Sequence, residues 1–445
     1  MPAQDQKALL LQALDAAADA HIRLLQTFVQ TPSPNPPGDT RAAAALLTAF
    51  LDSHGVPYEI VTPSRDNGAN DEVRYPNIVS DFAGGAGPGP RLVLNGHIDV
   101  FPVDPASRDQ WTHDPWSGAI EGDRIHGRGV VDMKLGTAAL LVAYVFLYER
   151  RHLLRGSVAF CGVSDEETGG QWGTSYLVRS NQPRWGGDVM LGAEPVGVGS
   201  VRFSEKGTLR MRCVCATAGA HGAYTNLSQG AVRTAAAFLG DVVAAVEGLD
   251  AEARLPPSIV EQLRRPDVRQ RIDDIMGPGT ADVIAKPTVN IGTIEGGVGS
   301  AINMIPDTCR FSLDIRMPVG LTRDDVLPVI EKATEKYKPA ASFVLSVVEP
   351  ASNPASVSPL GHPVLDLLIR NAHGLAPGDP APLAIPSMGA TDCKHYRYAG
   401  IPAYIYGGSP KTMAQVNESA SIREYLHVIK VHASAVWDHL TSTEV

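Results

Sequence analysis

The 445-residue chain has only five cysteines, no block of basic residues, and no internal repeat or low-complexity tract. Its 38 Lys and Arg against 48 Asp and Glu give a formal net charge of −10, which argues against nucleic acid or an anionic membrane as a partner. The cysteines are odd in number and scattered, mostly in apolar segments, and their spacing does not suggest a zinc knuckle. We therefore expect reduced structural thiols in a cytoplasmic protein.

Targeting segments and long apolar runs are missing as well. Residues 1–6 show no basic-then-apolar signal, and no apolar run reaches the roughly 18 residues of a membrane helix, so a soluble protein is expected. The length and the 44% hydrophobic content are enough to bury a large core. They exceed one ordinary domain, so two domains are predicted.

The apolar pattern predicts an α/β catalytic domain interrupted by a smaller α+β domain. Residues 1–204 form the first part of the catalytic domain, residues 205–349 form the insert, and residues 350–445 complete the catalytic domain. Within the insert the order strand, helix, strand, strand, helix, strand predicts a βαββαβ unit with an antiparallel sheet. The charged segment 255–274 of the insert is either a pocket-forming loop or a solvated helix.

Three consecutive acids, Asp165, Glu166 and Glu167, follow the apolar run 157–163. That run has the length and composition of a buried strand, so the acids come at its carboxyl end. In open α/β sheets ligands bind at this edge, which favours a chemical role. Taken alone, such an acidic run is also typical of a solvated loop.

Other strand and helix ends supply further polar groups. His97 and Asp99 follow a predicted strand at 91–95, Asp132 comes just before an apolar helix at 135–148, and Glu194 follows a short strand. An imidazole and several carboxylates converging in this way are typical of a site for a borderline divalent metal such as zinc. The spacing also allows a core histidine, a helix-capping aspartate and a surface glutamate.

The chemistry of such a site assigns different tasks to neighbouring residues. Asp99 is too close in sequence to His97 to be an obvious extra ligand, so it is expected to accept the other imidazole N–H and fix the tautomer. On an extended backbone Glu166 and Glu167 cannot both face one ion. One of them would bind the metal, and the other would act as general base for the attacking water.

Six segments resemble, in family order over nearly the whole chain, the M20 family of metallopeptidases and amidohydrolases. This family includes acetylornithine deacetylase, succinyl-diaminopimelate desuccinylase, aminoacylase and the glutamate carboxypeptidases. The segments are Thr31-Pro32-Ser33-Pro34-Asn35-Pro36-Pro37-Gly38, Asn95-Gly96-His97-Ile98-Asp99, Gly127-Arg128-Gly129 with Asp132-Met133-Lys134, Asp165-Glu166-Glu167, Glu194-Pro195 and Gly389-Ala390-Thr391-Asp392.

The resemblance implies a zinc-exopeptidase-like mixed-sheet catalytic domain with an inserted lid and dimerisation domain. It also implies a site for one or two Zn²⁺ ions, with Co²⁺ or Mn²⁺ as possible substitutes. Asp132 would bridge the ions, His97 and Glu194 would complete one site, and Glu167 would belong to the other. Glu166 would be the base that moves a proton from the attacking water to the leaving nitrogen.

Substrate contacts are also implied by the resemblance. His221 matches a histidine that reaches into the partner subunit of a homodimer to stabilise the oxyanion. Asn303, Arg316 and Gly389 match substrate-holding positions, and an arginine fork suits a substrate carboxylate. Arg316 is also compatible with an ordinary surface residue at a strand end.

The chain departs from the family pattern at one metal ligand. The family has a histidine in a His-x-x-Asn/Asp-Glu pattern before the last helix, and here Asn417 and Glu418 fit the end of the pattern while Ala414 occupies the histidine position. Three explanations are open: an engineered substitution, a natural one-metal hydrolase, or a protein that has left hydrolysis for ligand binding or another acyl-transfer step. We expect the second ion to be weakly held or absent.

The predicted function is therefore a metal-dependent amidohydrolase acting on an N-acyl amino acid or a small peptide-like substrate. The alternative is a non-hydrolytic relative that binds a similar ligand or performs another acyl-transfer step. The acyl and side-chain pockets have no local signature in the sequence, because such pockets are built by loops.

Overall fold

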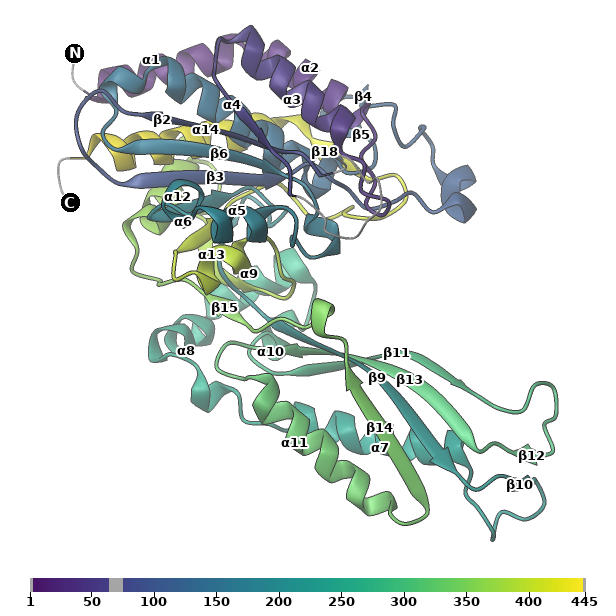
Figure 1. Ribbon diagram of the computed structural model, residues 1–445. Helices are drawn as coiled ribbons and strands as arrows, with labels where there is room; N and C mark the ends of the chain where they lie inside the picture. The colour runs from purple at the N-terminus through teal and green to yellow at the C-terminus, as the bar shows by residue number, and fades with distance from the viewer. Residues whose placement is uncertain (1–2, 64–74, 443–445) are drawn as a thin grey trace. The chain divides into compact units, whose positions relative to one another are not determined.

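The computed structural model describes residues 3–63 and 75–442, so the first two residues of the N-terminal segment considered above lie outside the described part (Figure 1). The chain divides into two compact units. Unit 1 consists of Met1–Phe203, Ser358–Ile385 and Thr391–Val445, and unit 2 consists of Ser204–Val357 and Pro386–Ala390. The chain thus returns to unit 1 at Ser358, where the sequence pattern places the return at residue 350.

A nine-stranded mixed sheet lies mostly in unit 1, and its short strand β15 belongs to unit 2. Its order is β1-β2-β6-β3-β7-β17-β8-β15, with β16 paired to β8, and the central neighbours β6, β3, β7 and β17 are parallel. The strands are β1 (Glu59–Val61), β2 (Asn77–Ala83), β3 (Arg91–His97), β6 (Ser157–Val163), β7 (Val189–Gly192), β8 (Ser200–Glu205), β15 (Ser356–Val357), β16 (Leu383–Ser387) and β17 (Ala403–Ile405). The predicted α/β class with a mixed sheet is confirmed.

Helices of unit 1 pack around this sheet (Figure 1). The N-terminal segment forms two helices that meet at Ala17. The helices are α1 (Ala3–Ala16), α2 (Ala18–Val29), α3 (Arg41–Ser53), α4 (Leu135–Glu149), α5 (Thr174–Ser180), α6 (Gln182–Trp185), α12 (Pro363–Leu375), α13 (Cys393–Tyr398) and α14 (Ile422–Thr441).

Helix α4 is apolar on all sides, which is typical of a helix surrounded by protein. Together with the turn before it, it forms the segment Val130–Glu149, which by length and composition alone could cross a membrane. Asp132 and Lys134 interrupt this segment, so the expectation that no apolar run reaches about 18 residues still holds. Because 94% of its most apolar window is buried inside the structure, the segment is a core helix that packs against α14 and β3.

A small three-stranded sheet, β18-β5-β4, was not predicted. Strands β4 (Ala119–Glu121), β5 (Arg124–His126) and β18 (Ser419–Ser421) have three residues each, too few to show an alternating pattern. β5 and β18 come from distant parts of the chain and pair antiparallel, with Ser419 opposite His126. This pairing brings the segment that carries Ala414 next to the segment that leads to Asp132.

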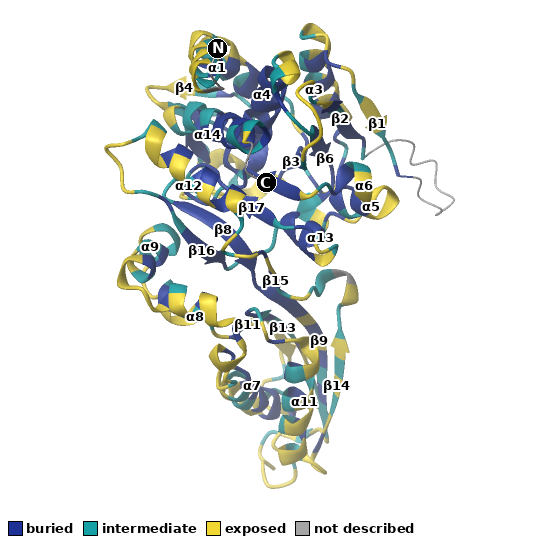
Figure 2. Cartoon of the chain, turned by 90° about the vertical axis from the view of Figure 1, so that its left-hand side faces the viewer, coloured by how far each residue is buried: buried dark blue, intermediate teal, exposed yellow. Residues whose placement is uncertain are grey.

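Unit 2 contains a four-stranded antiparallel sheet of order β11-β13-β9-β14, and the predicted βαββαβ order is confirmed. Helices α7 and α11 share one core with the buried face of this sheet, as Figure 2 shows by colour. The elements are β9 (Gly207–Thr217), β10 (Ala220–His221), α7 (Ala231–Glu247), α8 (Pro257–Arg264), α9 (Pro266–Met276), α10 (Thr280–Val283), β11 (Thr288–Gly296), β12 (Met304–Ile305), β13 (Thr308–Met317), α11 (Arg323–Thr334) and β14 (Ala341–Val347).

All five cysteines are buried free thiols, as their apolar surroundings predict. Cys161 and Cys393 lie in unit 1, and Cys213, Cys215 and Cys309 lie in unit 2. Burial raises the pKa of the Cys161 thiol to about 12 and the pKa values of the Cys213 and Cys215 thiols to about 11, because it disfavours the charged thiolate.

Candidate active site and metal centre

The candidate site of unit 1 lies at the carboxyl ends of three adjacent parallel strands. β3 pairs with β6 on one side and with β7 on the other. β3 ends at His97, β6 is followed by Glu166 and Glu167, and β7 is followed by Glu194. The sheet order therefore explains why residues up to about 100 positions apart in the sequence reach one place.

His97 is completely buried, and its two ring nitrogens have different partners. Nδ1 lies 2.8 Å from the backbone carbonyl oxygen of Asp99 and 3.5 Å from that residue's Oδ1. A carbonyl oxygen can only accept a hydrogen bond, so Nδ1 carries the proton and Nε2 is left to act as a ligand. The group that fixes the tautomer is thus mainly the Asp99 carbonyl, where the sequence suggested its carboxylate.

The Asp99 carboxylate instead holds the segment that carries the two glutamates. Its Oδ1 accepts a hydrogen bond from Glu166 N, and its Oδ2 accepts one from Glu167 N, both at 3.2 Å. Asn35 Nδ2 also donates to Oδ2 at 2.8 Å. Burial alone would raise the pKa of Asp99, but its hydrogen bond to His97 and the charge of that ring outweigh burial and lower it.

Glu166 and Glu167 begin a 3₁₀ turn, Glu166–Thr168, so the backbone at this point is not extended. Asp165, which precedes them, has φ of 78°, a conformation uncommon for a residue with a side chain. Its carboxylate is bound by the Thr168 hydroxyl and by Trp172 N, and these bonds hold the turn closed.

Asp132 lies in an irregular turn between β5 and α4, with non-helical dihedrals. The turn can approach β3 and β7 closely because two glycines leave room: a Cβ on Gly136 would collide with the Ala193 carbonyl, and one on Gly96 would lie 3.1 Å from Thr137 Cα. The Thr137 hydroxyl donates to the His97 carbonyl oxygen. These contacts fix the start of α4 against the strand that carries His97.

Glu418 supports the same turn from the other side. It is buried, and its Oε1 accepts hydrogen bonds from Val131 N at 2.9 Å and from Asp132 N at 3.4 Å. Its Oε2 forms an ion pair of 2.6 Å with Arg128, whose side chain is only 6% exposed. Glu418 and Arg128 therefore form a buried support for the Asp132 turn.

The structure brings His97, Asp132 and Glu194 together as one possible metal-binding group. One ligand atom from each residue lies within 4.8 Å of the others. His97 Nε2 is 3.1 Å from Asp132 Oδ1, 3.8 Å from Glu194 Oε1 and 4.0 Å from Glu166 Oε2. One imidazole and two carboxylates form a donor set that suits a divalent ion such as zinc.

The electrostatics of the group call for a cation. Burial raises the pKa values of Glu166, Glu167 and Glu194, and the Asp132 carboxylate near each of them adds to the effect. Burial alone would lower the pKa of His97, but the surrounding carboxylates, Glu194 first, raise it well above its usual value. Several buried carboxylates around one imidazole are stabilised in their charged forms when a dication lies among them.

One oxygen of Glu167 also needs a compensating positive charge or hydrogen bond. Its Oε1 is buried and has no hydrogen-bond partner among the described residues. A buried carboxylate oxygen without a partner is costly unless a cation or a proton meets it. The family resemblance assigns Glu167 to a second ion, and the histidine position that the family pairs with it is Ala414.

Ala414 lies in the turn-rich segment between β17 and β18 and is exposed. Its φ of 59° is left-handed, a region where histidine, asparagine and aspartate are more frequent than other residues with side chains. Neighbouring Gln415 donates its side-chain N–H to the Lys411 carbonyl at 3.3 Å. The backbone at position 414 is thus suited to a histidine, while the residue present offers no ligand atom.

Asp392 and Glu418 are two further functional candidates, which the sequence analysis places in family-matching segments without assigning them a role. Asp392 is buried, and its Oδ2 accepts a hydrogen bond from Thr174. Burial raises its pKa to about 6, and its charge contributes to the raised pKa values of Glu166 and Glu194. Glu418 is the other candidate. Both stand in segments that match the family, and that match was the only signal available.

The four predicted substrate residues belong to unit 2. His221 and Asn303 are brought together: β10 pairs with β12 so that His221 lies opposite Met304, and Gly222 N donates to the Asn303 carbonyl at 2.6 Å. Arg316 is half-buried and bonds Asp314 at 2.9 Å. Gly389 is an exposed residue in the short segment that the chain contributes to unit 2 near its end.

Arg316 lies far from His221 and Asn303 within this unit. β13 begins at Thr308, near β12, and Arg316 comes eight residues later on the same strand. At about 3.3 Å per residue the strand separates the two ends by about 26 Å. Figure 1 shows β10 and β12 at one end of β9 and β13. One small substrate cannot touch His221 and Arg316 of the same unit.

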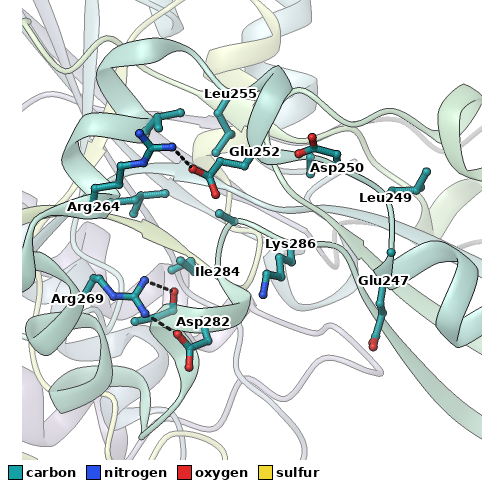
Figure 3. A pocket seen from close by; sticks show the side chains of 16 residues that line it. Glu247, Leu249, Asp250, Glu252, Leu255, Arg264, Arg269, Asp282, Ile284 and Lys286 are labelled. Carbon is teal, nitrogen blue, oxygen red and sulfur yellow. Dashed lines mark hydrogen bonds and ion pairs between the residues drawn. The ribbon is translucent and has the colours of Figure 1, made fainter.

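A separate cavity of about 550 Å³ lies in unit 2 between the end of α7 and helices α8 to α10 (Figure 3). The segment 255–274, left open above, is therefore helical and lines a cavity. Arg264 pairs with Glu252 at 2.8 Å, and Arg269 pairs with Asp282 at 2.5 Å, so these lining charges are already compensated. None of the predicted site residues lines this cavity.

Comparison with known proteins identifies a peptidase family and two related desuccinylases. The model of the peptidase family M20/M25/M40 matches residues 93–438. A succinyl-diaminopimelate desuccinylase of Methylobacterium radiotolerans is 26% identical over 422 residues, which cover 92% of this chain and 94% of the relative. Another desuccinylase, from Methylobacterium sp. strain 4-46, is 33% identical over 230 residues, or 49% of this chain and about half (55%) of that relative.

Solved structures share the fold at low sequence identity. A metallo-carboxypeptidase of the M20 family from Sulfolobus solfataricus has a TM-score of 0.76 at 19% identity, covering 95% of this chain and 99% of that chain. Human carnosine dipeptidase 1 has a TM-score of 0.74 at 16% identity, with coverage of 98% and 99%. A dinuclear metal-binding peptidase of Bacillus subtilis has a TM-score of 0.59 at 13% identity, with coverage of 96% and 99%.

Proposed function

Because the chain belongs to the peptidase family M20/M25/M40 and is a hydrolase acting on amide bonds, we propose that it cleaves N-acyl amino acids or small peptide-like substrates with a divalent metal ion. The observation that carries the proposal is the group of His97, Asp132 and Glu194, whose ligand atoms lie within 4.8 Å of one another. Zn²⁺ suits this donor set best, and Co²⁺ and Mn²⁺ are substitutes. The relatives named as desuccinylases support the N-acyl amino acid class.

A bound divalent ion supplies a Lewis acid that polarises the scissile carbonyl and makes water more acidic. Glu166 then has the task of taking a proton from the attacking water and delivering it to the leaving nitrogen. Its Oε2 lies 4.0 Å from His97 Nε2, so the carboxylate stands beside the proposed metal ligands, within reach of a water held there. Asp99 positions Glu166 through the bond to its backbone N–H.

We infer that only the site of His97, Asp132 and Glu194 holds its ion tightly. A second ion would meet Glu167, whose Oε1 is buried without a partner among the described residues, but Ala414 provides no imidazole at the family's histidine position. Membership of a hydrolase family favours a one-metal enzyme, natural or engineered, over a protein that only binds its ligand. The loss of one imidazole weakens binding of the second ion, and it leaves the ligands of the first ion, His97, Asp132 and Glu194, in place.

Two features of unit 2 support a homodimer. His221 and Asn303 lie about 26 Å along the strands from Arg316, so residues of both ends serve one substrate only if they come from different copies. In addition, the outer strand β11 is exposed and carries Ile291 and Ile294, exposed by 41% and 49%. An open, apolar edge strand is a ready surface for pairing with a second chain. We expect this dimer in the cytoplasm.

The direct test is a mass-spectrometric screen of N-acyl amino acids and dipeptides, with Zn²⁺, Co²⁺ or Mn²⁺ added in turn to the metal-free protein. We expect hydrolysis of at least one class, and a loss of about 10²- to 10⁴-fold in kcat for Glu166→Gln, which keeps the shape but cannot accept the proton. Equal turnover by Glu166→Gln would exclude its role as base. Absence of hydrolysis by both the native chain and Ala414→His would favour the ligand-binding alternative.

A further inference from the structure

We propose that His113, Glu121 and His126 form an additional site for a divalent transition metal on the surface of unit 1. The site is separate from the group of His97, Asp132 and Glu194 and does not depend on the proposed function. One ligand atom from each of the three residues lies within 4.8 Å of the others.

The local fold explains why these side chains meet. Glu121 is the last residue of β4 and His126 the last of β5, and the two strands pair so that Glu121 lies opposite Arg124 and Ala119 opposite His126. Both side chains therefore project from the same face of the hairpin, while Ile125 is buried on the other face. His113 reaches this face from the loop before β4.

The distances between the three side chains allow a metal site. His113 Nε2 lies 3.2 Å from Glu121 Oε1, and His126 Nε2 lies 4.0 Å from Glu121 Oε2, so one carboxylate faces two imidazoles. The two imidazole rings are 4.8 Å apart between centroids. Ligand bonds of 2.0–2.2 Å in a tetrahedral site place donor atoms about 3.3–3.6 Å apart. Small side-chain rotations reach this geometry, and the Glu121 side chain is 64% exposed and free to make them.

The chemistry of the three groups selects the ion. Two imidazoles and one carboxylate, with a position left for water, suit Zn²⁺ and also Ni²⁺ and Cu²⁺, whereas Mg²⁺ and Ca²⁺ prefer oxygen ligands. The positive charge opposite Glu121 is engaged elsewhere, because Arg124 donates to Ser419 Oγ at 2.8 Å. The Glu121 carboxylate is thus available to an ion.

Binding here would tighten the support of the candidate active site. Next to His113, Thr112 N donates to Asn417 Oδ1 at 2.7 Å. Next to His126, Gly127 N donates to the Glu418 carbonyl at 2.9 Å. An ion held by both histidines therefore links the segments of His113 and His126, which bind Asn417 and Glu418 through their backbone N–H groups. We expect zinc to raise the thermal midpoint of unit 1 through this site.

The test counts zinc in the full chain after equilibrium dialysis against micromolar Zn²⁺. We expect His126→Gln and the exposed Glu121→Gln each to bind one equivalent less than the native chain. His54→Gln is the matched control, because His54 Nδ1 lies 3.3 Å from Glu149 Oε1 in a histidine–glutamate pair outside this group. Tryptophan fluorescence checks that each variant is folded. Equal zinc counts in all four proteins would overturn the proposal.

A residue-specific readout distinguishes this site from the other ligands. Diethyl pyrocarbonate modifies exposed imidazoles, and mass spectrometry gives the extent at each histidine. Zinc should slow modification of His113 and His126 at least fivefold in the native chain, and should leave His54 unchanged. The protection should be lost in Glu121→Gln. Protection that persists in Glu121→Gln, or no protection at either histidine, would contradict a shared ion.

Discussion

The ion pair of Glu418 and Arg128 allows a sharp prediction about the stability of unit 1. Both side chains are buried, 2.6 Å apart, and Glu418 also accepts hydrogen bonds from Val131 N and Asp132 N. In Glu418→Gln the amide oxygen can still accept these bonds, but the Arg128 charge loses its partner. Breaking a buried ion pair from one side costs about 3–5 kcal/mol, and the remaining hydrogen bonds place this variant near 3 kcal/mol.

Related variants separate the contributions. Glu418→Ala also removes two hydrogen bonds, each worth about 1 kcal/mol, so we expect it to lose about 4–5 kcal/mol. Arg128→Met leaves the Glu418 carboxylate buried and unpaired. Burial already raises the pKa of Glu418, so its folded pKa lies above the unfolded one and the folded state binds the proton more tightly. The stability of Arg128→Met should therefore rise as the pH falls from 8 towards about 4.5.

The assay is urea unfolding followed by tryptophan fluorescence. All five tryptophans lie in unit 1, so the signal reports on that unit. A double-mutant cycle of Glu418→Gln and Arg128→Met gives the coupling energy, provided the slopes in urea stay equal. Zinc affinity, measured on the same proteins, should fall by about tenfold in Glu418→Ala because the Asp132 turn is released. A loss below 1 kcal/mol in Glu418→Gln, or additive single effects, would refute the buried-support reasoning.

Three further predictions test other parts of the structure. Ala414→His should raise tightly bound zinc by one equivalent and increase turnover, measured by metal analysis and kcat; an unchanged count would mean that position 414 does not reach the second ion. Mixing His221→Ala with Glu166→Gln subunits should restore part of the activity if His221 acts across a dimer, and no recovery would place both in one subunit. Burial lowers the pKa of Lys134 to about 7, so between pH 7 and 9 the native chain should gain stability relative to Lys134→Met; parallel pH curves would contradict this.

Much of the fold can be predicted from the sequence because many of its apolar segments are long enough to show a helix or strand pattern. The strand predicted at 157–163 agrees with β6 to the residue, and the order of elements in the insert is as predicted. The sheet β18-β5-β4 was missed because three-residue strands carry no measurable period.

The residues of the candidate site could be predicted from the sequence, but the hydrogen bonds that hold them in place could not. The ends of β3, β6 and β7 bring His97, Glu166, Glu167 and Glu194 to one edge, as expected from parallel strands. That the Asp99 carboxylate would hold two backbone N–H groups was not predictable, because it depends on the 3₁₀ turn after β6. Nor was the role of Glu418, which lies 286 residues from Asp132 and contacts only its backbone.

The buried thiols can report how often each unit opens, because both units contain cysteines of their own. A thiol reagent attacks only the thiolate of an accessible cysteine, and both access and ionisation are suppressed while each unit is closed. Labelling of Cys161 and Cys393 times the opening of unit 1, and labelling of Cys213, Cys215 and Cys309 times unit 2. Substrate or metal that protects one set and leaves the other unchanged would show which half of the chain feels the ligand, without any engineered probe.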